Sequence, residues 1–171
     1  MVERRMAMFE KFGEFNSVEE LNMAAEGFLK EGDLESLYAL AEENGIDKED
    51  VEDYVNGDTK VFATLSMAVF GRIDVQEKEI AKNEDKNEKM INMVILNMTK
   101  AIMTDHDIQE GIMKKGKRIT KIMELMKKEA KKHQDGMTGV SCGTDRELQN
   151  IIYAYFTDKN AEKVIKELYE L

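Results

Sequence analysis

The chain has 171 residues, a formal net charge of −10, no proline and a single cysteine. This length can bury one sizeable core or two small ones, and the lone Cys142 excludes an internal disulfide. No run of about 18 apolar residues is present, and the first nine residues lack an apolar secretory segment, so we expect a cytosolic protein that does not enter a membrane.

Three short helices are predicted in the acidic segment between Phe9 and Asp58, which holds sixteen carboxylates against three lysines. Each predicted helix begins after an N-cap residue, and a glycine closes the second and the third. Ser17 and Glu20 also have the spacing of a capping box. We therefore expect an acidic three-helix lobe over residues 1–58. The predicted N-caps and closing glycines are Ser17, Asp33 and Asp47, then Gly45 and Gly57.

Residues 59–171 are predicted to form a helical bundle, which makes the expected fold all-α. Val61 to about Ile73 is strongly apolar, and Gly71 either weakens this segment or allows close packing. Thr144 and Glu147 form a second capping box that opens a helix, and a final helix begins at about Asn160.

The segment from Met90 to Met103 shows the broad apolar stripe that is typical of a central core helix, and we expect it to be the hub of the bundle. This stripe is also compatible with a homodimer, although it does not require one. Its members are Met90, Ile91, Val94, Ile95, Met98, Ala101 and Ile102.

A lysine-rich amphipathic helix is predicted within Gly111–His133, where nine Lys and Arg residues face two glutamates. Its apolar residues share one side, whereas the lysines point the opposite way and form a ridge. This ridge could balance the acidic lobe, dock against a second copy, or contact the phosphates of a structured RNA. No aromatic residues interleave the lysines, so base stacking is not supported. The candidate RNA or dimer contacts are Lys117, Lys121 and Lys128.

The sequence offers no positive case for an enzyme. His106 and His133 are the only histidines, and neither has ligands at metal-binding spacing. No phosphate-binding loop, dinucleotide fingerprint or nucleophile elbow is present. We therefore predict no catalytic residue, no metal and no cofactor.

The acidic segment has the spacing of a helix-turn-helix, with the turn at Gly45 and a would-be recognition helix over Asp47–Asn56. That helix carries five carboxylates and one lysine, and DNA phosphates would repel it, so no direct binding to duplex DNA is expected. One interpretation is an ordinary helical hairpin. A sharper one is a helix pair that presents carboxylates where a nucleic acid presents phosphates.

Four short stretches resemble anti-CRISPR Cas9 inhibitors, a family related to the PcfK-like proteins of phages and conjugative elements. The resemblance is good across residues 9–58 and thinner across residues 114–155. The final helix and the loop over residues 136–143 depart from the family pattern. The stretches are Glu10–Glu14, Glu31–Asp33, Glu43–Tyr54 and Lys114–Lys117.

This resemblance implies a non-enzymatic inhibitor in the cytoplasm of a bacterial host cell, which binds Cas9 with its guide RNA and blocks target DNA recognition or cleavage. Cas9 has basic channels for nucleic acid that an acidic lobe could occupy. The charge pattern and the resemblance together assign the contacts to seven acidic residues. They are Glu42, Glu43, Asp47, Glu49, Asp50, Glu52 and Asp53.

Three other functions remain open. The protein could be an accessory protein-binding module of a conjugative element that does not touch CRISPR machinery. It could be a helix-turn-helix regulator whose lysine helices contact DNA as a dimer. An enzyme, such as a nuclease that trims guide RNA, is the last alternative, because no metal-binding carboxylate group is identifiable.

Overall fold

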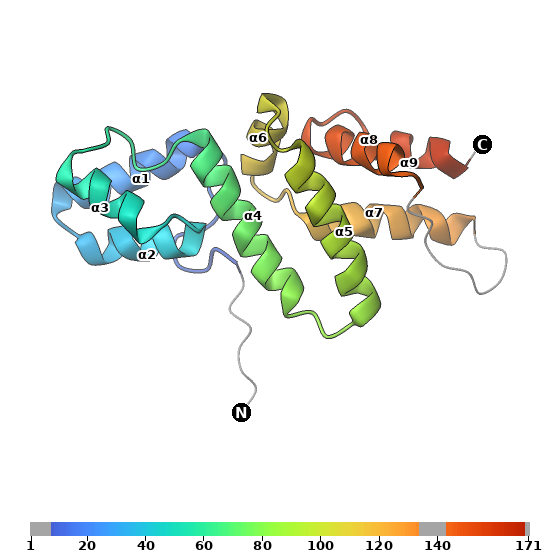
Figure 1. Ribbon diagram of the computed structural model, residues 1–171, viewed down its shortest axis with the longest axis horizontal. Coiled ribbons are helices and arrows are strands. Elements are labelled where there is room, and N and C mark those ends of the chain that lie inside the picture. Colours follow the sequence, from blue (N-terminus) through green and yellow to red (C-terminus); the bar gives the residue numbers. More distant parts are fainter. Residues whose placement is uncertain (1–7, 134–142, 170–171) are drawn as a thin grey trace. The chain divides into compact units, whose positions relative to one another are not determined.

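Helices form all of the regular structure in residues 8–133 and 143–169, the part of the chain that the computed structural model describes (Figure 1). The prediction of an all-α fold is confirmed. Cys142 and most of the glycine-containing loop before it lie outside the described residues. The helices are α1 (Val18–Glu31), α2 (Leu34–Asn44), α3 (Lys48–Asn56), α4 (Leu65–Ala81), α5 (Lys86–Ile102), α6 (His106–Met113), α7 (Ile119–Lys132), α8 (Asp145–Phe156) and α9 (Ala161–Tyr169).

Local capping interactions explain most of the helix starts. The Asp33 carboxylate accepts the Ser36 N–H at 3.0 Å, and Thr144 with Glu147 forms the predicted reciprocal capping box. Ser17 caps α1, but the Glu20 carboxylate accepts the N–H of Asn16 at 2.8 Å, one residue before the position that a capping box requires. Asp47 occupies the N-cap of α3 without a capping hydrogen bond from its side chain.

The chain divides into two compact units. Unit 1 consists of the described residues up to Glu79 together with Met113–Gly116, and unit 2 consists of Ile80–Ile112 and the described residues from Lys117 onward. The three acidic helices therefore share unit 1 with most of α4. Because residues 113–116 belong to unit 1, the chain enters this unit twice.

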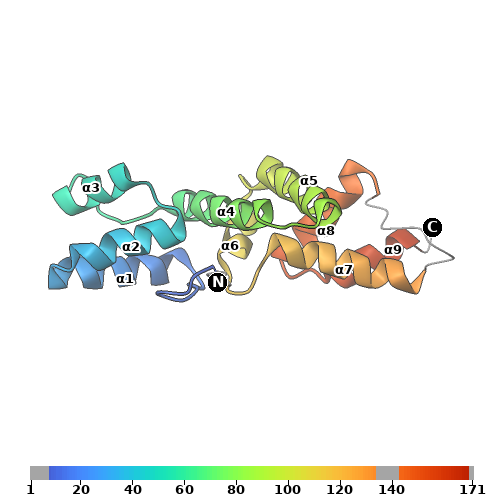
Figure 2. The same cartoon turned by 90° about the horizontal axis from the view of Figure 1, so that it is seen from below.

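Unit 1 is built around the helical hairpin of α1 and α2, which lie side by side in Figure 2. Asn22 of α1 holds the segment before α4 through both backbone groups of Ala63, at 2.8 and 2.9 Å. The rings of Tyr54 and Phe62 meet edge to face with centroids 5.7 Å apart. These contacts enclose an apolar core. Its fully buried members include Leu21, Ala25, Leu37, Leu40, Val51 and Val69.

Gly71 lets α4 approach the turn between α2 and α3 backbone to backbone. A Cβ atom on Gly71 would lie 2.2 Å from the carbonyl oxygen of Asn44, and one on Gly45 would lie 2.6 Å from the carbonyl oxygen of Gly71. No side chain fits at such distances. Of the two roles that the sequence suggests for Gly71, close packing is therefore the correct one.

Unit 2 is organised around α7 and α8 rather than around α5. Helix α7 contacts α5, α8 and α9, and α8 contacts α5 and α9 as well. Gly111 of α6 packs against α8, where a Cβ would lie 2.1 Å from the carbonyl oxygen of Phe156. The centre of this unit is made of fully buried aliphatic and aromatic side chains. They include Ile95, Ile112, Ile122, Ile151 and Phe156.

The prediction that the apolar stripe of α5 lies in the core is wrong for most of its members. Of the seven stripe residues only Ile95 is buried, whereas Met90 is 62% exposed and Val94 is 45% exposed. The buried side of α5 instead carries Asn92, Ile95, Leu96 and Thr99. The Thr99 hydroxyl can be buried there because it donates to the Ile95 carbonyl oxygen at 2.8 Å.

Candidate binding surface

The outer side of α3 is lined with carboxylates. Val51 and Tyr54 face the core, so the residues on the opposite side of this helix point to solvent. Glu49, Glu52 and Asp53 occupy that side, and all three are exposed. Glu42, in the last turn of α2, and Asp47, at the N-cap of α3, are exposed as well. We call these five residues the acidic surface.

Two of the seven predicted contact residues do not belong to the acidic surface. The Glu43 carboxylate accepts the backbone N–H groups of Lys11 at 2.6 Å and Phe12 at 3.0 Å, and thereby fixes the segment before α1. Asp50 is partly buried. The structure thus gives Glu43 an architectural role that neither charge nor spacing indicates, because its partners lie 31 and 32 residues away in the sequence.

Little positive charge compensates the acidic surface. Lys48 is the only basic residue in α2 and α3, and its ammonium lies 3.6 Å from the Glu52 carboxylate. Both side chains are at least half exposed, so this pair contributes about 0.5 kcal/mol or less. The other four carboxylates of the acidic surface make no ion pair within the described residues. Unit 1 therefore presents a largely uncompensated negative field at α2 and α3.

The α2 and α3 helices have the turn of a helix-turn-helix, and Gly45 adopts the left-handed conformation there (φ 66°). Helix α4 packs on this turn through Gly71, which leaves the carboxylate side of α3 in solvent. A recognition helix that meets DNA uses its exposed side. Because that side carries Glu49, Glu52 and Asp53, phosphate repulsion argues against duplex DNA as the ligand.

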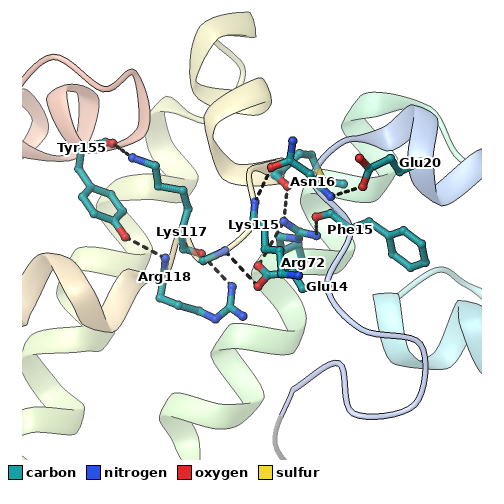
Figure 3. Close-up of polar contacts among 11 residues, drawn as sticks. Glu14, Phe15, Asn16, Glu20, Arg72, Lys115, Lys117, Arg118 and Tyr155 are labelled. Atoms are coloured by element: carbon teal, nitrogen blue, oxygen red, sulfur yellow. Dashed lines mark hydrogen bonds and ion pairs between the residues drawn. The ribbon is translucent and has the colours of Figure 1, made fainter.

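The predicted lysine ridge is mostly neutralised within unit 2. Lys117 precedes α7 and is turned inward, and its ammonium lies 2.6 Å from the Tyr155 carbonyl oxygen (Figure 3). The same ammonium lies 2.6 Å from the Asp158 carboxylate. It also lies 4.5 Å from the centre of the Tyr155 ring. Lys117 therefore does not project from the ridge, because the helix that would project it begins only at Ile119.

The lysines of α7 divide into paired and unpaired groups. Lys128 lies 3.2 Å from Glu162, Lys127 lies 2.5 Å from Glu88, and Lys132 lies 2.6 Å from Glu129. Lys121 is exposed and makes no ion pair within residues 8–133 and 143–169. Of the three predicted contacts, only Lys121 thus keeps an uncompensated charge, and the ridge is a weak candidate for binding phosphate.

Arg72 is a structural part of unit 1 that the helical patterns of the sequence do not indicate. Its side chain is 2% exposed, donates to the carbonyl oxygens of Phe15, at 2.7 Å, and of Met113, and lies 3.5 Å from the Glu14 carboxylate (Figure 3). Glu14 in turn accepts the Gly116 N–H at 3.0 Å. This network ties residues 113–116 to the segment before α1. A single cation within the apolar stretch Val61–Ile73 was the available signal.

Unit 2 contains a pocket of 310 Å³ whose lining includes Lys117, Leu125, Tyr155, Asp158 and Glu162. Its charged groups are already engaged, because Lys117 pairs with Asp158 and Glu162 pairs with Lys128. A ligand would have to displace these ion pairs, so the pocket is not the binding site that we favour.

Neither histidine belongs to a metal site in the described part of the chain, which contains no group of three or more potential metal ligands. His106 lies 3.4 Å from Glu110. His133 lies 3.1 Å from Glu129 and stacks on Tyr169 with ring centroids 5.0 Å apart. Among the described helices, none combines the length and the apolar character needed to cross a bilayer.

Comparisons with protein-family models, with curated proteins and with solved structures found no match to this chain.

Proposed function

We propose that this protein is a non-enzymatic inhibitor that uses its acidic surface to bind a basic protein channel, and that its partner is Cas9 with guide RNA. The observation that carries the proposal is the exposed carboxylate side of α3, where the one ion pair within the described residues is that of Lys48 with Glu52. Binding would block the recognition or cleavage of target DNA. The choice of Cas9 among basic partners comes from the resemblance of the sequence stretches named above.

Electrostatics supports a protein channel rather than a nucleic acid as the target. Cas9 holds its guide and target duplex in a positively charged channel and reads a short duplex motif through arginines. Carboxylates on a helix can occupy such a channel, whereas they repel phosphate. Most lysines of α7 pair with carboxylates of unit 2, so Lys121 is the one of the three predicted RNA contacts whose charge is left for guide RNA.

The test is co-elution of the protein with Cas9, with and without guide RNA, combined with a DNA cleavage assay. We expect a stable complex and a loss of cleavage. Both should weaken as salt is raised, because the contacts are charged and exposed. If the two proteins elute separately and cleavage is unaffected, the Cas9 assignment is wrong.

A charge-reversal variant tests whether the acidic surface makes the contact. The variant Glu49→Lys, Glu52→Lys, Asp53→Lys changes the net charge by the same amount as the control variant Glu26→Lys, Glu31→Lys, Glu35→Lys. All six positions are exposed and lie in α1, α2 and α3. We expect at least tenfold weaker inhibition from the first variant, equivalent to about 1.4 kcal/mol, and a much smaller change from the control. Equal effects would show that only total charge matters.

The same surface would also suit a second candidate, an accessory protein of a conjugative element that binds another basic transfer protein. The acidic surface specifies the chemistry of its partner and leaves these two partners open. A pull-down from a host that lacks Cas9 separates them, because only the accessory protein would capture a specific partner there. A gel-shift assay with duplex DNA tests the regulator alternative, which predicts binding that falls steeply with salt.

A further inference from the structure

Helix α5 carries apolar residues beyond the side that it buries in the core. Asn92, Ile95, Leu96 and Thr99 face the core of unit 2, where α7 and α8 contact this helix. Most of the apolar residues that were expected in the core lie outside this side: Met90, Val94 and Ala101 are opposite it, whereas Ile91, Met98 and Ile102 flank it, and Met98 also contacts Gln149 of α8. Apolar side chains that lie together on an exposed surface often mark a site of association. The outer side of α5 therefore has the composition of a surface that is buried in an assembly.

The outer apolar residues follow the spacing of a helix-pairing seam. Ile91, Val94, Met98 and Ala101 are separated by three, four and three residues, which is the alternation seen where two helices pack along their length. Met90 and Ile102 flank this row. We call these six residues the α5 seam. Met90, Val94 and Ala101 are exposed, and the other three are partly buried.

We propose that the α5 seam binds the α5 seam of a second copy of this chain, with the two helices antiparallel. The spacing reads the same in both directions around residue 96. A twofold axis at that point places Val94 against Met98 of the partner subunit, and Ile91 against Ala101 of the partner subunit. Met90 then faces Ile102 of the partner subunit. The surface is thus complementary to itself, as a twofold homodimer requires.

The charges at the two ends of the seam favour this arrangement. Lys86 is the first residue of α5, Asp105 follows its last turn, and both are exposed. Antiparallel packing brings Lys86 close to Asp105 of the partner subunit at each end. A parallel pair would instead place Lys86 beside Lys86 of the partner subunit. The seam itself carries no charge, so two copies can meet there although each has a net charge of −10.

A second copy is a better occupant than another acidic or basic macromolecule, because the centre of the seam offers no charged group to pair with either. Self-association through α5 also leaves the carboxylates of α3 unused, since the two sets of residues belong to different helices. The dimer does not depend on the identity of the partner of the acidic surface. Its failure would leave the Cas9 proposal intact, and the reverse is also true.

The first experiment measures the mass of the full chain in solution by sedimentation equilibrium over a range of concentrations. We expect the mass to approach twice the 19.6 kDa of one chain. Val94→Glu should lower the association constant at least tenfold, because it buries an unpaired carboxylate at the dimer interface. Met23→Glu is the matched control: Met23 is 71% exposed on α1, and this variant should dimerise as the parent does.

Circular dichroism checks that neither variant has lost its fold. Both variants should retain the helical signal and the unfolding midpoint of the parent monomer. A parent chain that stays monomeric at every concentration overturns the proposal. Dimerisation that persists in Val94→Glu also overturns it, and so does dimerisation that is lost equally in Met23→Glu.

The second experiment tests the antiparallel register by disulfide crosslinking. In a Cys142→Ser background, one chain carries Val94→Cys and another carries Met98→Cys. The proposed register brings these two positions together, so an oxidised mixture should form a disulfide dimer much faster than either variant alone. A parallel pair would crosslink Val94→Cys with itself. Equal rates for the mixture and for the single variants would exclude the proposed register.

Discussion

Gly45 and Gly71 pack backbone against backbone, so that a Cβ on Gly45 would lie 2.6 Å from the carbonyl oxygen of Gly71. This contact seats α4 on the turn between α2 and α3. Because the turn is held from one side, α3 can bury Val51 and Tyr54 while its carboxylates stay in solvent. The exposure of the acidic surface thus depends on two residues that carry no side chain.

Gly71→Ala should destabilise unit 1 by about 2 to 3 kcal/mol, because the new methyl group overlaps the Asn44 carbonyl oxygen. In an unhindered helix the same substitution stabilises by up to about 1 kcal/mol. Gly27→Ala in α1 is the control, since nothing lies within 4 Å of a Cβ at that position. Chemical denaturation measures both. If Gly71→Ala and Gly27→Ala are both more stable than the parent, α4 does not pack closely against the turn.

Arg72→Met should cost about 3 kcal/mol or more, because it leaves the buried Glu14 carboxylate without its cation and two carbonyl oxygens without their donor. Glu14→Gln should cost less, since the amide oxygen can still accept the Gly116 N–H. Thermal unfolding measures both. If Arg72→Met unfolds at the same temperature as the parent chain, the network does not support unit 1.

The features that could be predicted from the sequence are local ones. Asp33, Gly45 and Thr144 mark helix ends because a cap acts within four residues, and the pattern of such residues is visible in the chain. The environment of Arg72 could not be predicted in this way. Its acceptors belong to Phe15 and Met113, 57 and 41 residues away, and such pairings are decided by tertiary packing.

Glu43→Ala should lower the free energy of unfolding by about 1 kcal/mol, because the N–H groups of Lys11 and Phe12 lose their charged acceptor. The neighbouring Glu42→Ala should change it by about 0.5 kcal/mol or less, since Glu42 is exposed. The comparison separates a carboxylate that supports the fold from one that is available to a partner. Equal losses of stability in the two variants would show that Glu43 supports the fold no more than Glu42 does.

Lys117→Ala should destabilise unit 2 by about 1 to 2 kcal/mol, because the ammonium bridges the Tyr155 carbonyl oxygen and the Asp158 carboxylate. Lys121→Ala should be neutral for stability within about 0.5 kcal/mol. Urea denaturation at neutral pH gives both values. If RNA binding is then detected, Lys121→Ala should weaken it. If only Lys117→Ala weakens it, Lys117 is the RNA contact instead.

The stability of unit 2 should decrease in acid through Glu129. The ammonium of Lys132, at 2.6 Å, and the His133 ring, at 3.1 Å, lower the pKa of Glu129 below its ordinary value of 4.5, and burial opposes them. An acid with a lowered folded-state pKa stabilises the fold above 4.5 and loses that contribution as the pH falls below it. Denaturation across this range should show a shallower decline for Glu129→Gln. The exposed Glu124→Gln is the control, and matching slopes for these two variants would contradict the assignment.

The candidate site was predictable to a similar degree. Periodicity places Glu49, Glu52 and Asp53 on one side of α3, and the structure leaves all three exposed. Periodicity could not distinguish Lys117 from Lys121. Lys117 is turned inward by its contacts with Tyr155 of α8 and with Asp158 in the turn that follows α8. Periodicity also could not show that α5 would be covered on one side only. Those outcomes depend on which helices meet, and the composition of one helix does not contain that information.

The return of the chain to unit 1 at residues 113–116 has a practical consequence for dissecting the protein. A fragment ending at Glu79 would keep all three acidic helices yet lack the Met113 carbonyl oxygen that Arg72 requires and the Gly116 N–H that Glu14 holds. Such a fragment would bury an incompletely paired guanidinium. A minimal version of unit 1 would therefore need residues 113–116 joined to α4 by a short engineered linker.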